Sequence, residues 1–205
     1  FRQNKPEEGQ ERLAAARSLA PDDARLLIAE AQLLRDAGRH ADSYALLAAA
    51  LQAQPDEPDL LYESALSAER LGRMDVLEGN LRRLMEIRPN SAPAYNALGF
   101  SLADRNVRLE EAAQLIERAL ALAPDDPFIL DSKGWLLFRQ GRYADALAAL
   151  QRAFGKRPDP EIAAHIGEVL WALGRPAEAK AVWAQAAKAH PNNETLAATI
   201  KRFTP

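Results

Sequence analysis

The sequence predicts an all-α fold in which pairs of helices repeat along the chain and stack into a solenoid. Composition is the first reason, because alanine occurs 42 times and leucine 30 times among 205 residues, while aromatic residues make up 6%. Alanine and leucine are strong helix formers, and this bias disfavours sandwiches, barrels and doubly wound sheets. Periodicity is the second reason. Six prolines recur at intervals of 33 to 35 residues, namely Pro21, Pro55, Pro89, Pro124, Pro158 and Pro191. A period of this size indicates a repeat architecture.

Other positions come into register when the blocks are aligned on these prolines. A small residue recurs in the first half of each block, at Ala31, Ala65, Gly99, Gly134 and Gly167. A glycine follows it in four of the five blocks, at Gly38, Gly72, Gly141 and Gly174. A large apolar residue recurs in the second half, at Leu47, Leu81, Ile116, Leu150 and Trp183. The glycines allow a left-handed turn between two helices, the small residues allow close helix approach, and the large residues fill the space between helices.

The elements follow from this register. Each block predicts two helices of about 13 to 15 residues, such as Pro127–Arg139 and Tyr143–Lys156, from their apolar spacing. The aspartates after Pro21 and Pro124 predict N-caps for first helices. Further prolines fall in first turns, where a missing N–H costs nothing, at Pro58, Pro93, Pro127, Pro160 and Pro176.

The domain organisation predicted for residues 1–205 is a single array. Residues 1–20 form the trailing second helix of a preceding repeat, residues 22–190 form five full repeats, and residues 193–203 form a C-terminal capping helix. In the capping helix, Leu196, Ile200 and Phe203 are expected to point inward, and Glu194, Lys201 and Arg202 outward, as a solenoid end requires. The leading half repeat predicts that further repeats precede residue 1 in the native protein.

These registers resemble the tetratricopeptide repeat (TPR), a helix–turn–helix unit of about 34 residues. The block Asp125–Pro158 matches best, at Gly134, Gly141, Tyr143, Ala146, Leu150, Ala153 and Pro158. The resemblance covers essentially the whole chain and implies a right-handed superhelix. The third block departs from it, with one extra residue around Arg105–Arg108 and no turn glycine. The second block has Leu77 and Leu84 where small residues are expected, and Gly79 within its second helix, which predicts the softest repeat.

Composition and motifs exclude several classes of function. The chain has no cysteine, which excludes disulfides and thiolate metal sites, and a net charge of −3, which lacks the basic excess of a nucleic-acid binder. Its longest apolar run, Tyr44–Leu51, is too short to cross a bilayer. Glu161 and His165 have metal-ligand spacing but lack a third ligand nearby, so His165 is interpreted as an ordinary helix residue. No cofactor, metal or catalytic residue is predicted, and an enzyme is the alternative that nothing in the sequence supports.

The TPR resemblance implies that partners bind the concave face lined by the first helices, through the second, fifth, ninth, twelfth and thirteenth positions of each repeat. Aromatic and apolar residues gather at these positions, at Tyr62, Leu66, Phe100, Phe128, Trp135, Phe138 and Trp171, with Arg70, Asp104, Asp131 and Arg139 nearby. Such a mixture is typical of interface hot spots. Phe100, Trp135 and Phe138 are therefore expected to be exposed. The alternative is that these rings belong to the core, to which Tyr95, Tyr143, Leu150 and Trp183 are assigned.

A narrower resemblance lies in the second half of the chain. The strings Asn96–Gly99 with Leu102–Arg105, Asp131–Trp135 and His165–Gly174 are similar to those of proteobacterial TPR lipoproteins of the cell envelope. In that group, a lipidated periplasmic member is the adaptor of a carboxy-terminal processing protease, presenting its substrates. The resemblance therefore implies a protein-binding adaptor in the periplasm, anchored to the outer membrane by a lipid signal upstream of residue 1. A homo-oligomerising module of an envelope assembly is the alternative. Leu66, Phe100 and Trp135 stand where carboxylate-clamping TPRs carry asparagine, which disfavours that mode of binding.

Overall fold

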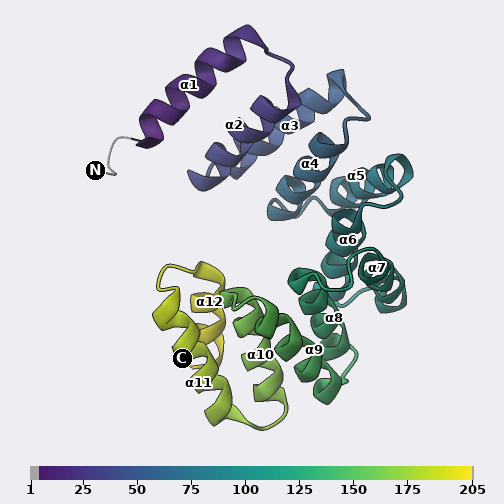
Figure 1. The fold of residues 1–205 in the computed structure, drawn as a ribbon, viewed down its shortest axis with the longest axis vertical. Helices are drawn as coiled ribbons and strands as arrows, with labels where there is room; N and C mark the ends of the chain where they lie inside the picture. The colour runs from purple at the N-terminus through teal and green to yellow at the C-terminus, as the bar shows by residue number, and fades with distance from the viewer. Residues whose placement is uncertain (1–4, 205) are drawn as a thin grey trace. The chain divides into compact units, whose positions relative to one another are not determined.

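A computed structural model describes residues 5–204, and this part of the chain consists of twelve helices without a β-strand (Figure 1). The helices are α1 (Lys5–Leu19), α2 (Ala24–Asp36), α3 (His40–Ala53), α4 (Pro58–Arg70), α5 (Met74–Ile87), α6 (Ala92–Asp104), α7 (Leu109–Leu122), α8 (Pro127–Arg139), α9 (Tyr143–Lys156), α10 (Pro160–Ala172), α11 (Pro176–Ala189) and α12 (Glu194–Phe203). The predicted all-α repeat fold is confirmed. The even-numbered helices from α2 to α10 are the first helices of the five repeats, and α12 is the predicted capping helix.

The chain divides into two compact units, residues 1–94 and residues 95–205, which are described separately below. Within each unit, the two helices of a repeat pack against each other, as α4 does with α5 and α8 with α9. A single array across both units stays a prediction.

Helix starts follow the capping chemistry expected from the sequence. The side chains of Asp23 and Asp126 accept backbone N–H groups of the first turns of α2 and α8. Asp159 and Asn193 do the same for α10 and α12, and Glu57 caps α4 although glutamate is not a preferred N-cap. Each capped helix thereby satisfies amide groups that have no partner within the helix.

The turns between paired helices are set by backbone conformation. Gly38, Gly72, Gly141 and Gly174 all have φ between 69° and 75°, in the left-handed region that glycine adopts without steric cost. The third repeat lacks this glycine and has one extra residue. There, Asn106 and Arg108 take the positive φ values, 55° and 48°. The irregular spacing of the third repeat is thus absorbed in its turn, and α7 begins immediately afterwards.

The core of the first unit lies between its paired helices. One cluster of buried side chains joins α2, α3 and the start of α4, through Leu27, Ala31, Leu47, Ala50 and Leu60. In α5, Leu77 and Leu84 are buried beside Leu81, so the two leucines that replace small residues are part of the packing. Asn80 of the same helix donates a hydrogen bond from Nδ2 to Ser64 Oγ at 3.1 Å. The softness expected of this repeat stays a prediction.

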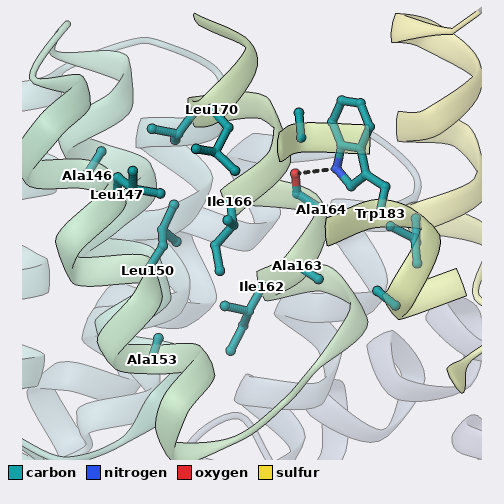
Figure 2. Close-up of a cluster of buried hydrophobic side chains, with 14 of the residues drawn as sticks. Ala146, Leu147, Leu150, Ala153, Ile162, Ala163, Ala164, Ile166, Leu170 and Trp183 are labelled. Atoms are coloured by element: carbon teal, nitrogen blue, oxygen red, sulfur yellow. Dashed lines mark hydrogen bonds between the residues drawn. The ribbon is translucent and has the colours of Figure 1, made fainter. Parts of the chain in front are cut away.

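Leu150 and Trp183 are large members of the buried core of the second unit (Figure 2), and each lies against a glycine of a first helix. Leu150 of α9 is fully buried, and a Cβ added at Gly134 of α8 would lie 2.5 Å from its Cγ. A Cβ at Gly167 of α10 would collide with the indole of Trp183, which is 1% exposed and donates from Nε1 to the carbonyl of Ala164 at 3.2 Å. The core assignments of Leu150 and Trp183 are confirmed.

The other two residues assigned to the core, Tyr143 and Tyr95, are not fully buried. Tyr143 is 37% exposed, so its assignment to the core is wrong. It is the first residue of α9, where one side of the ring meets Phe138 at 5.6 Å between centroids and the other meets solvent. Tyr95 is half-buried, with the guanidinium of Arg118 over its ring.

The capping helix α12 packs as predicted on the last repeat. Leu196 is buried in the core cluster of the second unit, and Ile200 and Phe203 pack against that cluster. Lys201 and Arg202 remain exposed. The helix therefore covers apolar surface of α10 and α11 with its own apolar side.

Two glycine substitutions test this account of the packing. Gly79 lies in α5 with no atom near the place of a Cβ, so Gly79→Ala should raise the stability of the chain by up to about 1 kcal/mol through helix propensity alone. Gly167→Ala adds the same methyl group against Trp183 and should lower stability by about 1–3 kcal/mol. Urea unfolding of both variants measures the difference. A loss of stability in Gly79→Ala would contradict the open environment described for it.

Candidate partner-binding site

The first helices of the second unit bring four rings into one continuous row. Phe100 of α6 and His165 of α10 have ring centroids 6.1 Å apart, and His165 stacks on Trp135 of α8 at 4.2 Å. Trp135 in turn stacks on Phe138 at 4.9 Å. Three members of this row are predicted site residues, and the fourth, His165, is not. We call Phe100, His165, Trp135 and Phe138 the ring row.

Hydrogen bonds hold the centre of the ring row from both sides. Trp135 donates from Nε1 to Asp104 Oδ1 at 3.0 Å. His165 Nδ1 lies 2.8 and 3.0 Å from the two carboxylate oxygens of Asp131. Arg139 donates to the carbonyl and the carboxylate of Asp104, and its guanidinium carbon lies 4.9 Å from the centre of the Trp135 ring. The indole is thus held by one hydrogen bond, two stacked rings and one guanidinium group over its ring.

A second ion pair extends this network to the capping helix. Glu168 of α10 is buried and pairs with Arg202 of α12. Burial raises the pKa of Glu168, and the charges of Arg202 and His165 oppose that rise. A buried carboxylate of this kind costs free energy unless a cation accompanies it, and Arg202 supplies that cation.

The expected exposure of Trp135 is wrong. Its side chain is only 4% exposed, because His165 and Phe138 cover its faces and Asp104 binds its single polar atom. Phe100 and Phe138 are half-buried, so the edges of the ring row, and not its centre, meet solvent. Trp135 therefore serves the site by holding its neighbours in place.

The other candidates of the second unit lie apart from the ring row. Phe128, at the start of α8, is 44% exposed with Arg157 over its ring at 4.9 Å. Trp171, at the end of α10, is half-buried against Trp183 at 6.0 Å and Phe203 at 5.4 Å. It contacts the core on one side and Lys180 on the other.

In the first unit, both candidates lie on α4. Tyr62 is half-buried and lines a hollow of about 450 Å³ together with Ile28 and Leu84, with Arg25 and Arg88 at its edge. Leu66 is half-buried as well and does not line this hollow. The structure therefore gives the first unit an open hollow around Tyr62, and the second unit a filled ring row.

Sequence reasoning missed the role of His165. It noted Asp104, Asp131 and Arg139 as polar neighbours of the rings, but interpreted His165 as an ordinary helix residue. The available signal was the repeat period, because Asp131 and His165 are 34 residues apart and Asp104 and Arg139 are 35 apart. Residues one period apart on first helices are neighbours in a stack.

The described part of the chain shows neither a metal cluster nor a membrane-spanning helix. Residues 5–204 hold no group of three or more histidine, aspartate or glutamate side chains arranged to bind a metal ion. None of the helices in this range is long and apolar enough to cross a membrane.

Comparisons with known proteins bear on the repeat and its fold. A family model described as tetratricopeptide repeat matches residues 1–58, 28–76 and 132–194. TPR repeat-containing protein PA4667 of Pseudomonas aeruginosa is 41% identical over 163 residues, which are 79% of this chain and 28% of that protein. Protein O-mannosyl-transferase Tmtc1 of Drosophila melanogaster is 34% identical over 128 residues, 59% of this chain and 15% of that protein. This chain thus spans less than a third of either relative.

Among solved structures, the thermophilic TPR protein TTC0263 of Thermus thermophilus matches with a TM-score of 0.77. The match covers 85% of this chain and 95% of that chain at 24% sequence identity. This likeness shows the fold.

The burial of Trp135 predicts a stability cost equal to that of a core residue. Trp135→Ala should lose about 3–5 kcal/mol of unfolding free energy, as Trp183→Ala should, because both remove a packed and hydrogen-bonded indole. Phe128→Ala, at an exposed position of the same helix as Trp135, should lose about 1 kcal/mol or less. Thermal melts of the three variants decide the order. A Trp135→Ala variant that melts like Phe128→Ala would show that the indole is open to solvent.

Proposed function

The chain belongs to the tetratricopeptide repeat family, and on that premise we propose that it is a non-catalytic interaction module that binds a partner protein or peptide on the first-helix face of its second unit. The observation that carries the proposal is the ring row. Aromatic rings with an adjacent arginine have the composition of interface hot spots. Their fixed arrangement lowers the entropy that binding must overcome.

The half-buried edges of Phe100 and Phe138 are the contact points that this face offers. Asp104, 53% exposed, and Arg139, 30% exposed, lie beside them and can bond polar groups at the rim. An apolar stretch of a partner, as a helix or an extended segment, suits such a surface. Tyr62 and its hollow offer a second contact in the first unit.

The finer proposal concerns the partner. We propose that the chain is an adaptor of a periplasmic carboxy-terminal processing protease and presents that protease with its substrates. Support comes from the similarity of Asn96–Gly99, Asp131–Trp135 and His165–Gly174 to envelope TPR lipoproteins. A location in the periplasm, with an outer-membrane lipid anchor upstream of residue 1, is part of the same proposal.

A binding titration with the carboxy-terminal processing protease of the source organism tests both levels. The wild-type chain should bind the purified protease. Phe138→Ala should weaken binding about 30-fold, the effect of losing a hot spot worth about 2 kcal/mol. The matched control is Phe154→Ala, which removes a partly buried ring that lines a separate hollow between α9, α10 and α11, and should bind like wild type.

The interaction module and the protease adaptor can be refuted separately. If the protease does not bind while another envelope protein binds through Phe138, the adaptor role is refuted and the interaction module stands. If the chain instead self-associates at micromolar concentration, and Phe138→Ala abolishes the association, the face is a contact between copies of this chain. Equal binding by Phe138→Ala and Phe154→Ala would refute the site.

A further inference from the structure

His165 occupies the centre of the ring row and joins three helices. It stacks on Trp135 of α8 at 4.2 Å, meets Phe100 of α6 at 6.1 Å, and pairs with Asp131 of α8 at 2.8 Å. The side chains of His165 and Asp131 are 14% and 10% exposed. This pair is therefore largely removed from water. In such a buried environment the charge state of one partner strongly affects the other.

Three carboxylates act on His165, namely Asp104 from α6, Asp131 from α8 and Glu168 from α10 itself. Two of them carry a guanidinium partner, since Arg139 of α8 pairs with Asp104 and Arg202 of α12 pairs with Glu168. The helices α9 and α11 pack against α10 with apolar side chains of the core cluster. The cluster thus contains three carboxylates and two guanidinium groups, and a protonated His165 brings its net charge to zero.

Loss of that proton would leave one buried carboxylate without a matching cation. A neutral imidazole also lacks the attraction that a cation has for the faces of Trp135 and Phe100. Both effects weaken the same contacts, namely those that fix the ring row.

We propose that His165 is a proton-dependent clamp on the partner-binding face, which holds the ring row in its binding arrangement when protonated and loosens it when neutral. The clamp is a regulation of the site proposed above, and its link to binding rests on that proposed function. His165 acts here as a positioning residue, because it orders the rings that meet the partner.

The direction of the proton equilibrium agrees with this geometry. Burial lowers the pKa of His165, but the charge of Asp131, its hydrogen bond, and the charges of Glu168 and Asp104 outweigh burial and raise the pKa above the ordinary value of 6.5. Because the pKa of His165 is raised in the folded chain, protonation of His165 stabilises the fold, and this stabilisation is fully present below pH 6.5. The stabilisation is lost as the pH rises through the pKa of the folded chain.

The clamp is tested first on the free chain. An NMR titration of the wild-type chain should give His165 a pKa above 6.5, with the indole N–H resonance of Trp135 shifting at the same midpoint. The chain has three histidines, so the spectra of His40→Gln and His190→Gln identify two of the histidine resonances and leave the third as that of His165. A His165 midpoint below 6.5, or an indole resonance that ignores the titration, would overturn the proposal without any partner.

Melting temperatures provide a second measurement. Between about pH 6 and pH 9, the melting temperature of the wild-type chain should fall by about 2–4 °C more than that of His165→Gln. This is the shift expected from an interaction worth about 1 kcal/mol in a chain of this size. Asp131→Asn keeps the shape of the side chain and should remove the same pH dependence. The exposed histidine variant His190→Gln should behave like wild type. Identical pH profiles for wild type and His165→Gln would overturn the clamp.

Binding to the processing protease then separates the clamp from the function it regulates. Wild-type affinity should fall about tenfold from pH 6 to pH 9, while His165→Gln should show weak binding with a much smaller pH dependence, and His190→Gln should follow wild type. Equal wild-type affinity at both pH values would refute the clamp and leave the proposed function intact. Failure to bind at either pH would refute the protease as partner, whereas the free-chain titration would still decide the clamp.

Discussion

The packing of the last three repeats depends on one recurring contact, a glycine of the first helix lying under a large apolar residue of the second. Gly134 under Leu150 and Gly167 under Trp183 are its clearest instances, since a single added carbon at either glycine would collide with the side chain above it. Close approach of the two backbones buries the large side chain almost completely. It also fixes the rotation of each first helix about its axis. That rotation decides which residues the helix presents to its neighbours and which to solvent.

The candidate site is a direct consequence of this fixed rotation. In the second unit, first helices of successive repeats are neighbours, so contacts form between residues 31 to 35 positions apart, such as Asp104 with Trp135, and Asp131 with His165. Each of these residues would be solvated on an isolated hairpin. Stacking of neighbouring repeats largely buries Trp135, Asp131 and His165, whereas Asp104 stays half exposed. Asp131 and His165 pair there, because an unpaired buried carboxylate costs free energy.

The parts predicted from sequence are those set by local chemistry or by the period itself. Turn glycines, capping residues such as Asp126, and the small and large core positions all recur at the predicted places. The exposure of Trp135 could not be predicted, because it depends on which side chains of α6 and α10 reach the indole. The TPR resemblance implies that a ninth position faces the groove, and it does not say whether neighbouring side chains cover the residue there. Only the rotamers of Asp104 and His165, fixed by the packed structure, decide that this ring is covered. The prediction for Tyr143 is wrong in the opposite direction, because the sequence assigns this residue to the core and it is exposed. It lies at the very start of α9, where one side of its ring has no neighbour.

The same side chains therefore serve two purposes in the second unit. Trp135, His165 and Asp131 join adjacent repeats, and through those bonds they also set the spacing of Phe100 and Phe138, whose edges reach solvent. A partner that binds this face, as proposed, meets rings whose positions the stack has already determined, and it need not displace the buried indole. Stability and recognition are then coupled through one network. A substitution that loosens the joint between repeats must also disturb the surface presented to the partner, whereas a substitution at an exposed edge such as Phe138 can alter binding with less effect on the stack.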